Sequence, residues 1–390
     1  MHFGGVQDES RVISVVWGFT VKRCFVGHLT NSGANGYSSV VLSSNTEIQR
    51  LTDVARQLNK QDDPMLDPEF FLASVCKGWH PKVVAVSYAR EVVGIVYTKE
   101  RVIRGIPTGV VYCDGSLDGI QLGNPLHRQN SFRLAMETLL LSPRIRGVRL
   151  RLLPCSDELG VTKQLVSSGA FDAQYSQIKS SNSNFWKCHA HLSLADTYEQ
   201  FLKGMGYTTR HNFRYYRRRF EASGHGFVER LSVEKLRSAA LDLLPKSKVS
   251  SWRTRFTLET GLNMVAAASR PLAIGLKHHN GEWLSVIGGW YRPRRAILCF
   301  QCNNDRDFGP DSLSVVLRSF LIELLIRQGL KELLIWGDTG PPLSHYVTYL
   351  PMIGVRLDSP RRLWRVVHAL LSAVGPWLPK RLAEAVQWVA

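Results

Sequence analysis

The 390-residue sequence lacks several features that mark specialised classes of protein. Its seven cysteines are an odd number, which argues against a complete set of disulfides and favours a reduced, cytoplasmic chain. It contains no run of about 18 uncharged apolar residues, so no membrane-spanning helix is predicted. It shows neither a glycine period nor a sustained heptad repeat. Acidic residues are scarce, 32 against 49 lysines and arginines, and the net charge of +17 favours anionic partners such as phosphates, nucleic acid or an anionic membrane.

The first 45 residues have no clear hydrophobic periodicity. An apolar run at 12–29 is interrupted by Lys22 and Arg23, and acidic residues precede it. A signal peptide has the opposite order, with its positive charge before the apolar stretch. We therefore predict no signal peptide and expect residues 1–45 to be an N-terminal extension.

A pattern of hairpin, strand, helix and strand occurs twice, about 190 residues apart. The hairpins span 82–99 and 271–293, and the second contains the tight-turn pair Asn280-Gly281. The strand, helix and strand that follow are expected at 109–113, 131–141 and 147–153 in the first copy and at 296–302, 312–328 and 331–337 in the second. The duplication predicts two domains of one mixed α/β fold, over residues 46–180 and 185–357.

A strongly basic helix is predicted between the two copies, within 197–224. Phe213, Tyr216 and Phe220 share one face. The basic face carries Arg210, Arg214, Arg217 and Arg218. Three interpretations remain open: a site for a polyanionic acceptor or a nucleotide phosphate, an RNA surface on which interleaved tyrosines stack on bases, or a solvated helix face.

The C-terminal segment 358–390 is predicted to form amphipathic helices. Its basic and polar residues project into one narrow sector of a helical wheel, and apolar residues cover the rest. A narrow basic face beside a wide apolar face is typical of helices that lie on an anionic membrane. Packing of the apolar face against the core or a partner is the alternative.

Three segments in this order resemble the CelD-like acyltransferases, the cellulose-biosynthesis branch of the Gcn-related N-acetyltransferase (GNAT) superfamily. They are the basic helix FLKGMGYTTRHNFRYYRRRFEASG, the loop and helix NDRDFGPDSLSVVL (304–317) and the strand and turn LLIWGDTGPPLSHY (333–346). In the second segment, Asp305, Ser312 and Leu317 match the family pattern. The resemblance covers roughly residues 46–350 and implies tandem GNAT-like acyl-CoA N-acyltransferase domains. Two-domain Fem-type peptidyltransferases are related to this family.

The resemblance implies an enzyme that transfers an acyl group from acetyl-CoA or another acyl-CoA to an amine or amino-sugar acceptor, in polysaccharide or cell-envelope biosynthesis. The second domain would hold the acyl-CoA, and the first would be degenerate. The arginines of the basic helix and Asp305 would bind the acceptor. A peripheral position at the inner membrane face is expected. A Fem-like transferase that uses aminoacyl-tRNA and a non-catalytic binding module remain alternatives.

The expected acyl-CoA site is the N-terminus of the helix that begins near Ser312, because unpaired N–H groups and the helix dipole attract phosphate there. Ser312, Leu313 and Ser314 are the expected contacts. The sequence lacks the usual Arg/Gln-x-x-Gly-x-Gly/Ala loop, and Leu313 and Ser314 replace the Pro-Gly of the branch-specific loop. The alternative is that Asp311 or Ser312 simply caps an ordinary helix.

The expected catalytic residues follow the last strand of the second copy. Asp338 lies just beyond its apolar residues, where α/β sheets commonly place site residues. With His345 and Tyr346 it would bind the acceptor amine or act as a base. The alternative is a plain turn, because Asp-Thr-Gly-Pro-Pro is a good turn sequence.

No metal site is expected from the sequence. His278 and His279 are adjacent in a predicted turn, and a metal would need further ligands at matching spacing. Cys299 and Cys302 are a lone pair without the second pair that a structural zinc site requires.

Overall fold

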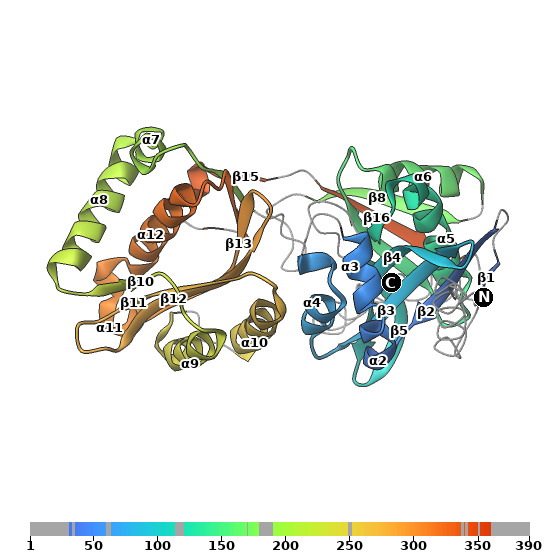
Figure 1. Ribbon diagram of the computed structural model, residues 1–390, viewed down its shortest axis with the longest axis horizontal. Coiled ribbons are helices and arrows are strands. Elements are labelled where there is room, and N and C mark those ends of the chain that lie inside the picture. The colour runs from blue at the N-terminus through green and yellow to red at the C-terminus, as the bar shows by residue number, and fades with distance from the viewer. Residues whose placement is uncertain are drawn as a thin grey trace, which may run out of the picture.

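The computed structural model describes residues 31–32, 36–59, 64–113, 121–169, 171–178, 190–248, 252–336, 339, 342–349 and 352–359. Asp338, residues 179–189 and the predicted amphipathic helices beyond 359 lie outside these residues. No helix in the described part of the chain is both long and apolar enough to cross a bilayer. Two mixed sheets, each covered by helices, lie beside each other (Figure 1).

The first sheet has the strand order β1-β2-β3-β4-β5-β7-β16-β8, with β6 paired to β4. Its strands are β1 (Asn31–Ser32), β2 (Tyr37–Leu42), β3 (Trp79–Tyr88), β4 (Glu91–Ile103), β5 (Ile106–Cys113), β6 (Gln121–Gly123), β7 (Gly147–Leu152), β8 (Asp172–Ile178) and β16 (Met352–Asp358). Its helices are α2 (Asn45–Gln49), α3 (Thr52–Leu58), α4 (Pro68–Ala73), α5 (Arg128–Leu141) and α6 (Asp157–Ser167).

The second sheet has the order β10-β11-β12-β13-β14-β9-β15. Its strands are β9 (Ala190–Ser193), β10 (Gly226–Val228), β11 (Pro271–Lys277), β12 (Trp283–Arg292), β13 (Arg295–Asn303), β14 (Glu332–Ile335) and β15 (Thr348–Tyr349). Its helices are α7 (Tyr198–Lys203), α8 (Tyr207–Ala222), α9 (Val233–Leu243), α10 (Trp252–Ala267), α11 (Asp305–Phe308) and α12 (Leu313–Arg327). The duplicated order predicted from the sequence is therefore present in both sheets.

One strand crosses from the second half to the first. The second sheet is built entirely from consecutive strands, and its first strand, β9, lies between β14 and β15, antiparallel to both. The strand β16 follows the second sheet in sequence but lies between β7 and β8 of the first sheet, also antiparallel to both. In Figure 1 the orange-red β16 accordingly lies among the green and cyan strands of the first sheet.

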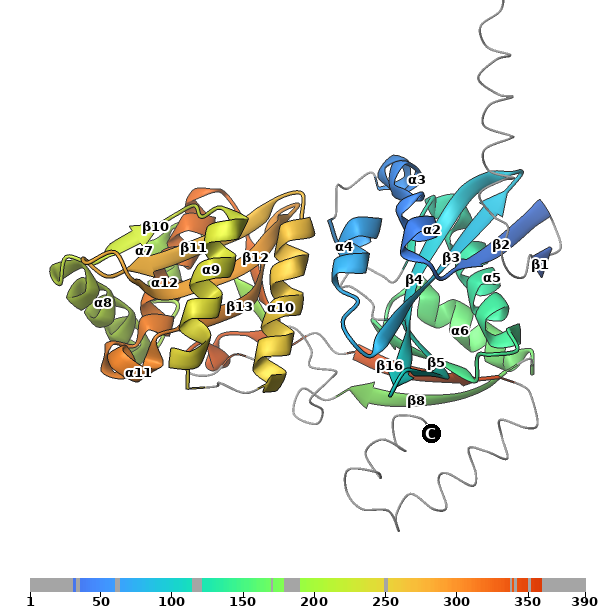
Figure 2. The ribbon, with the colours of Figure 1, turned by 90° about the horizontal axis from the view of Figure 1, so that it is seen from below.

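Each sheet buries both faces under helices, which explains its nearly continuous apolar strands. In the first half, α5 and α6 cover one face with a cluster that includes Phe132 and Leu357, and α2, α3 and α4 cover the other around Ile48. In the second half, α8 and α12 cover one face around Phe213, and α9 and α10 cover the other. Figure 2 shows α9 and α10 side by side on their face.

The short helix α4 joins the two cores. It begins at Pro68, directly after Asp67, whose side chain accepts a hydrogen bond from the backbone N–H of Glu69 at 2.8 Å. Phe71 packs into the first core, and Phe70 packs edge-on against Trp290 of the second, with ring centroids 4.9 Å apart. Because Phe70 is only 2% exposed, a buried hydrophobic contact links the two halves in addition to the strand β16.

Two predicted boundaries differ from the observed ones. Residues 37–42 were expected in the N-terminal extension, but they form β2, which pairs along β3. Residues 352–357 were expected in the second domain, but they belong to β16 of the first sheet. Both strands are short and acquire their place only from distant partners, which local periodicity does not reveal.

We predict that Leu357→Ala destabilises the first half of the molecule. Leu357 is fully buried in its core, and truncation of such a leucine costs about 2–5 kcal/mol of unfolding free energy. Hydrogen exchange should become faster in β7, which pairs with β16, while β13 keeps its protection. Ile353→Ala, at a half-buried position of the same strand, should have a smaller effect. Unchanged exchange in β7 would contradict the observed place of β16.

Candidate functional site

The strands β13 and β14 separate at their carboxyl ends. They pair in parallel from Arg295↔Glu332 to Leu298↔Ile335, and the backbone N–H of Trp336 still reaches the Leu298 carbonyl at 2.8 Å. Beyond this point β13 continues to Asn303 and, within the described residues, pairs only with β12. The carboxyl ends of parallel strands are the usual ligand sites of α/β sheets.

A β-bulge lies where the strands separate. The register between β12 and β13 shifts between Gly288 and Gly289, which leaves Cys299 as the extra residue of β13. A Cβ at Gly289 would lie 1.8 Å from the Ile297 carbonyl oxygen, so only glycine fits there. Bulges are common next to active sites because they redirect side chains. Burial raises the pKa of Cys299 and of Cys302 to about 12, so neither thiol is a nucleophile at neutral pH.

A polar network centred on Arg318 of α12 lies at this opening. The Arg318 guanidinium donates to Gln301 Oε1 and to Thr339 Oγ1, both at 2.9 Å. Gln301 in turn donates to Asn303 at 3.1 Å. Burial lowers the pKa of Arg318 to about 10, and no carboxylate among the described residues pairs with it. A cation among neutral groups can bind a carboxylate, a phosphate or a carbonyl oxygen that gains negative charge.

The predicted phosphate site lies at the start of α12. Ser312 has left-handed backbone angles, φ 47° and ψ 47°, and its side chain caps no backbone N–H. Capping by Ser312, the alternative raised by the sequence, is therefore not observed. Leu313 is buried, and Ser314 is half-buried in the first turn. Asp311, directly before this turn, pairs with Arg219 of α8 at 2.9 Å, which offsets a negative charge next to the helix end.

Of the three predicted catalytic residues, the structure describes His345 and Tyr346. Tyr346 accepts a hydrogen bond from the backbone N–H of Gly206 at 2.8 Å and lies 3.4 Å from Thr209 Oγ1. These contacts lower the pKa of the Tyr346 hydroxyl and attach it to the start of α8. His345 is exposed. Asp338 lies outside the described residues, one position before Thr339 of the Arg318 network.

The predicted acceptor-binding residues also divide into separate groups. Arg214 pairs with Glu199 at 2.5 Å, and Arg217 pairs with Glu323 at 2.6 Å while it lies over the Phe320 ring. Arg217 therefore holds α8 against α12. Asp305 accepts from the backbone N–H of residue 248 at 3.3 Å and contacts none of these arginines in the described interactions.

The exposed face of α8 forms a basic and aromatic surface. Arg210 and Arg218 have no ion pair among the described residues. Tyr207, His211 and Tyr215 stack in a row, with successive centroids 6.1 and 5.9 Å apart. These side chains line an open hollow of about 420 Å³: Tyr207, Arg210, His211, Arg214, Tyr215, Arg218, Arg219 and Ala222. We call this surface the α8 stack.

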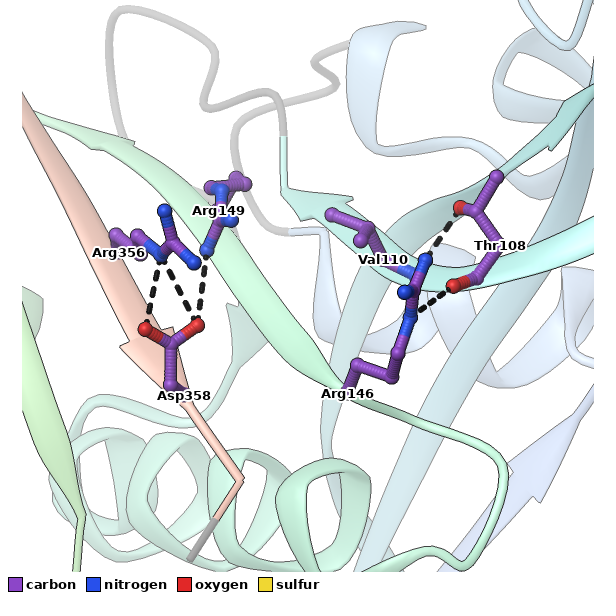
Figure 3. Close-up of polar contacts among 6 residues, drawn as sticks. All are labelled: Thr108, Val110, Arg146, Arg149, Arg356 and Asp358. Carbon is purple, nitrogen blue, oxygen red and sulfur yellow. Dashed lines mark hydrogen bonds and ion pairs between the residues drawn. The ribbon is translucent and has the colours of Figure 1, made fainter. Parts of the chain in front are cut away.

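A second basic group, not predicted from the sequence, crosses the first sheet. The registers place Tyr112, Arg149 and Arg356 opposite one another on β5, β7 and β16. Figure 3 shows both arginines directed at Asp358, with Arg149 at 3.4 Å and Arg356 at 2.8 Å. Burial and the Arg356 charge lower the pKa of Arg149. Arginine alternates with leucine in β7, and Arg356 precedes Leu357 in β16, but only the insertion of β16 places the two strands side by side.

Comparison with known proteins supports the fold without identifying the chain. No protein-family model and no curated protein sequence matches it. The crystal structure of FemX is similar with a TM-score of 0.55 at 10% identity, over 84% of this chain and 99% of that one. A conserved protein of unknown function from Bacteroides thetaiotaomicron VPI-5482 matches with a TM-score of 0.53 at 10% identity, over 82% and 100% of the two chains.

The C-terminal domain of a putative lysylphosphatidylglycerol synthetase from Agrobacterium fabrum matches with a TM-score of 0.50 at 10% identity, over 83% of this chain and 95% of that one. Identities this low carry the fold and nothing more. The chain has the tandem GNAT-like fold that the resemblance implied, with one mixed sheet in each half.

We predict that Asp358→Asn weakens the first half of the molecule at neutral pH. Two guanidinium groups would then lie together without their shared carboxylate, at a cost of about 1–3 kcal/mol in a partly exposed site. Added sulfate or phosphate should restore the lost stability by replacing the carboxylate. Asp196→Asn, which breaks the exposed pair with Lys331, is the matched control and should leave the thermal midpoint unchanged. Equal midpoints for the two variants would contradict the shared role of Asp358.

Proposed function

We propose that this chain is an acyltransferase that moves an acyl group from acetyl-CoA or another acyl-CoA to an amine or amino-sugar acceptor. Polysaccharide or cell-envelope biosynthesis is the proposed setting. The observation that carries the proposal is the opening between β13 and β14. There Gln301 and Thr339 hold Arg318, which has no carboxylate partner among the residues that the structure describes. The tandem GNAT-like fold is consistent with this chemistry.

The chemistry asks little of the side chains. A thioester is already activated, so the protein must hold the donor, stabilise the charge that develops on the carbonyl oxygen and let the amine lose a proton. We assign the first task to the uncapped N-terminus of α12, where Ser312, Leu313 and Ser314 offer backbone N–H groups. Arg318 takes the second task, because a preformed cation stabilises an oxyanion without reorganisation.

We assign the proton transfer from the amine to the residues after β14. Tyr346 is a suitable acid for the leaving thiolate or base for the amine, because the Gly206 N–H and Thr209 lower the pKa of its hydroxyl. Asp338 and His345 stay in the proposal as alternative bases. The acceptor would approach along α8, where Arg210 and Arg218 are available to an anionic group.

We predict that Arg318→Met lowers kcat/KM for acyl transfer by about 100-fold, the usual size for loss of one oxyanion contact. Release of free CoA thiol with a panel of amines and amino sugars measures the reaction. Arg237→Ala, on the exposed surface of α9, is the control and should keep full activity. Full activity in the Arg318 variant would remove Arg318 from the mechanism.

Thermal shift tests donor binding separately, because a ligand that binds the folded state raises the midpoint. Stabilisation by acyl-CoA without CoA release from any amine would identify a binding module. Lack of stabilisation by acetyl-CoA and by longer acyl-CoAs would contradict the acyl-CoA donor.

Association of residues 360–390 with anionic membranes remains part of the proposal, and those residues lie outside the described part of the chain.

The α8 stack favours a second candidate, a Fem-like transferase whose donor is an aminoacyl-tRNA. Tyr207 is 75% exposed and Tyr215 is 48% exposed, so both rings are open to a ligand. Unpaired bases stack on such aromatic rings while nearby arginines bind the phosphates. The net charge of +17 agrees with a polyanionic donor.

We predict for this second candidate that the double variant Arg210→Gln, Arg218→Gln binds tRNA more weakly and with a shallower dependence on salt. Each lost phosphate contact should reduce the slope of log K against log salt by about 1 unit or slightly less. Arg255→Gln, on the exposed surface of α10, serves as the control and should leave the slope unchanged. Identical slopes for all three proteins would exclude the α8 stack as an RNA surface.

A further inference from the structure

Three histidines from separate segments meet at one end of the second sheet. The antiparallel pairing of β10 with β11 places Gly226 opposite Lys277, so His225 before β10 faces His278 and His279 after β11. The His225 ring lies 4.5 Å from the His278 ring and 5.6 Å from the His279 ring, between centroids. One ligand nitrogen from each ring lies within 4.8 Å of the others.

The surroundings of these rings are suited to a cation. His225 Nδ1 is buried and has no hydrogen-bond partner, which is uncommon for a buried polar atom. His278 Nδ1 accepts only a long hydrogen bond, 3.3 Å, from the backbone N–H of Asn280. The loss of this long hydrogen bond would cost little free energy if the His278 ring changed tautomer to bind a metal ion.

We propose that His225, His278 and His279 bind one divalent transition-metal ion, with Zn²⁺ as the reference metal. Three imidazoles without a thiolate suit Zn²⁺, Ni²⁺ or Cu²⁺ rather than Mg²⁺ or Ca²⁺. Zn–N bonds of 2.0–2.1 Å place tetrahedral ligand atoms about 3.3 Å apart, so the three nitrogens need to draw together by roughly 1–1.5 Å. His279 is exposed and can rotate freely enough to do so.

A water completes the fourth position of a tetrahedral set. Asp311 pairs with Arg219 at 2.9 Å and is not one of the three residues whose ligand atoms lie together. Phe308, in the segment before α12, packs 5.6 Å from the His278 ring, between centroids. The ion then fastens two segments together: the loop after α8 and the end of β11. This role does not depend on the proposed acyl transfer.

Equilibrium dialysis of the chelator-treated full chain against ZnCl₂ tests the site. The wild-type protein should take up one tightly bound ion, and His225→Ala and His278→Ala should bind it at least about tenfold more weakly. His80→Ala removes an exposed histidine of the first half and should bind like wild type. Zn²⁺ should also raise the thermal midpoint of the wild-type and His80 proteins but not of the other two.

Co²⁺ gives a second readout that depends on ligand geometry. The wild-type and His80 proteins should show the visible absorption of a tetrahedral Co²⁺ site, and the His225 variant should lack it. Circular dichroism of the metal-free proteins checks folding, and His279→Ala, at an exposed position, replaces any variant that fails to fold. Equal Zn²⁺ affinity in all variants, or no uptake by the wild-type chain, would overturn the proposal.

Discussion

The insertion of β16 into the first sheet is the constraint on which the rest of the molecule depends. This strand is the next-to-last member of a sheet whose other strands all lie before residue 179. Removing it leaves β8 without a strand partner among the described residues and leaves one edge of β7 unpaired. Unpaired backbone groups are costly once buried, so the first sheet is incomplete without a strand from the end of the second half. Phe70 adds a hydrophobic contact between the two halves.

The insertion of β16 also determines where charged side chains lie close together. Because β16 enters the first sheet, Arg356 and Asp358 meet Arg149 across the strands, and a row of polar residues crosses an otherwise apolar sheet. In the second sheet, β14 is held by β9 on one side and leaves β13 on the other beyond Ile335. The helix α12 spans this divergence and brings Arg318 to it. The opening between β13 and β14 is thus a consequence of the strand order. Arg318 reaches this opening because of its position along α12.

Sequence periodicity was sufficient for the local elements and insufficient for the contacts between them. The β-branched hairpins and the Asn280-Gly281 turn predicted the centre of both sheets, and the spacing of Phe213 and Phe220 predicted the buried face of α8. The sequence reveals the arginines of α8 but not which of them have an acidic partner. Glu199 and Glu323, which pair with two of these arginines, belong to other helices. Nothing in the sequence distinguishes Arg318 from other charged residues of a helix. His225 lies about 50 positions before His278 and His279 in the sequence, so local patterns do not reveal that the three rings meet. Charge balance and site assembly are tertiary properties that local patterns do not contain.

The central claim is that a donor binds where β13 and β14 separate, against the first turn of α12. Hydrogen exchange measured by mass spectrometry, with and without acyl-CoA, tests this claim most directly. The account predicts slower exchange at 299–303 and 313–318, with the first half of the chain unchanged. Protection confined to α8 or to the first sheet, with none at 299–303 and 313–318, would contradict it.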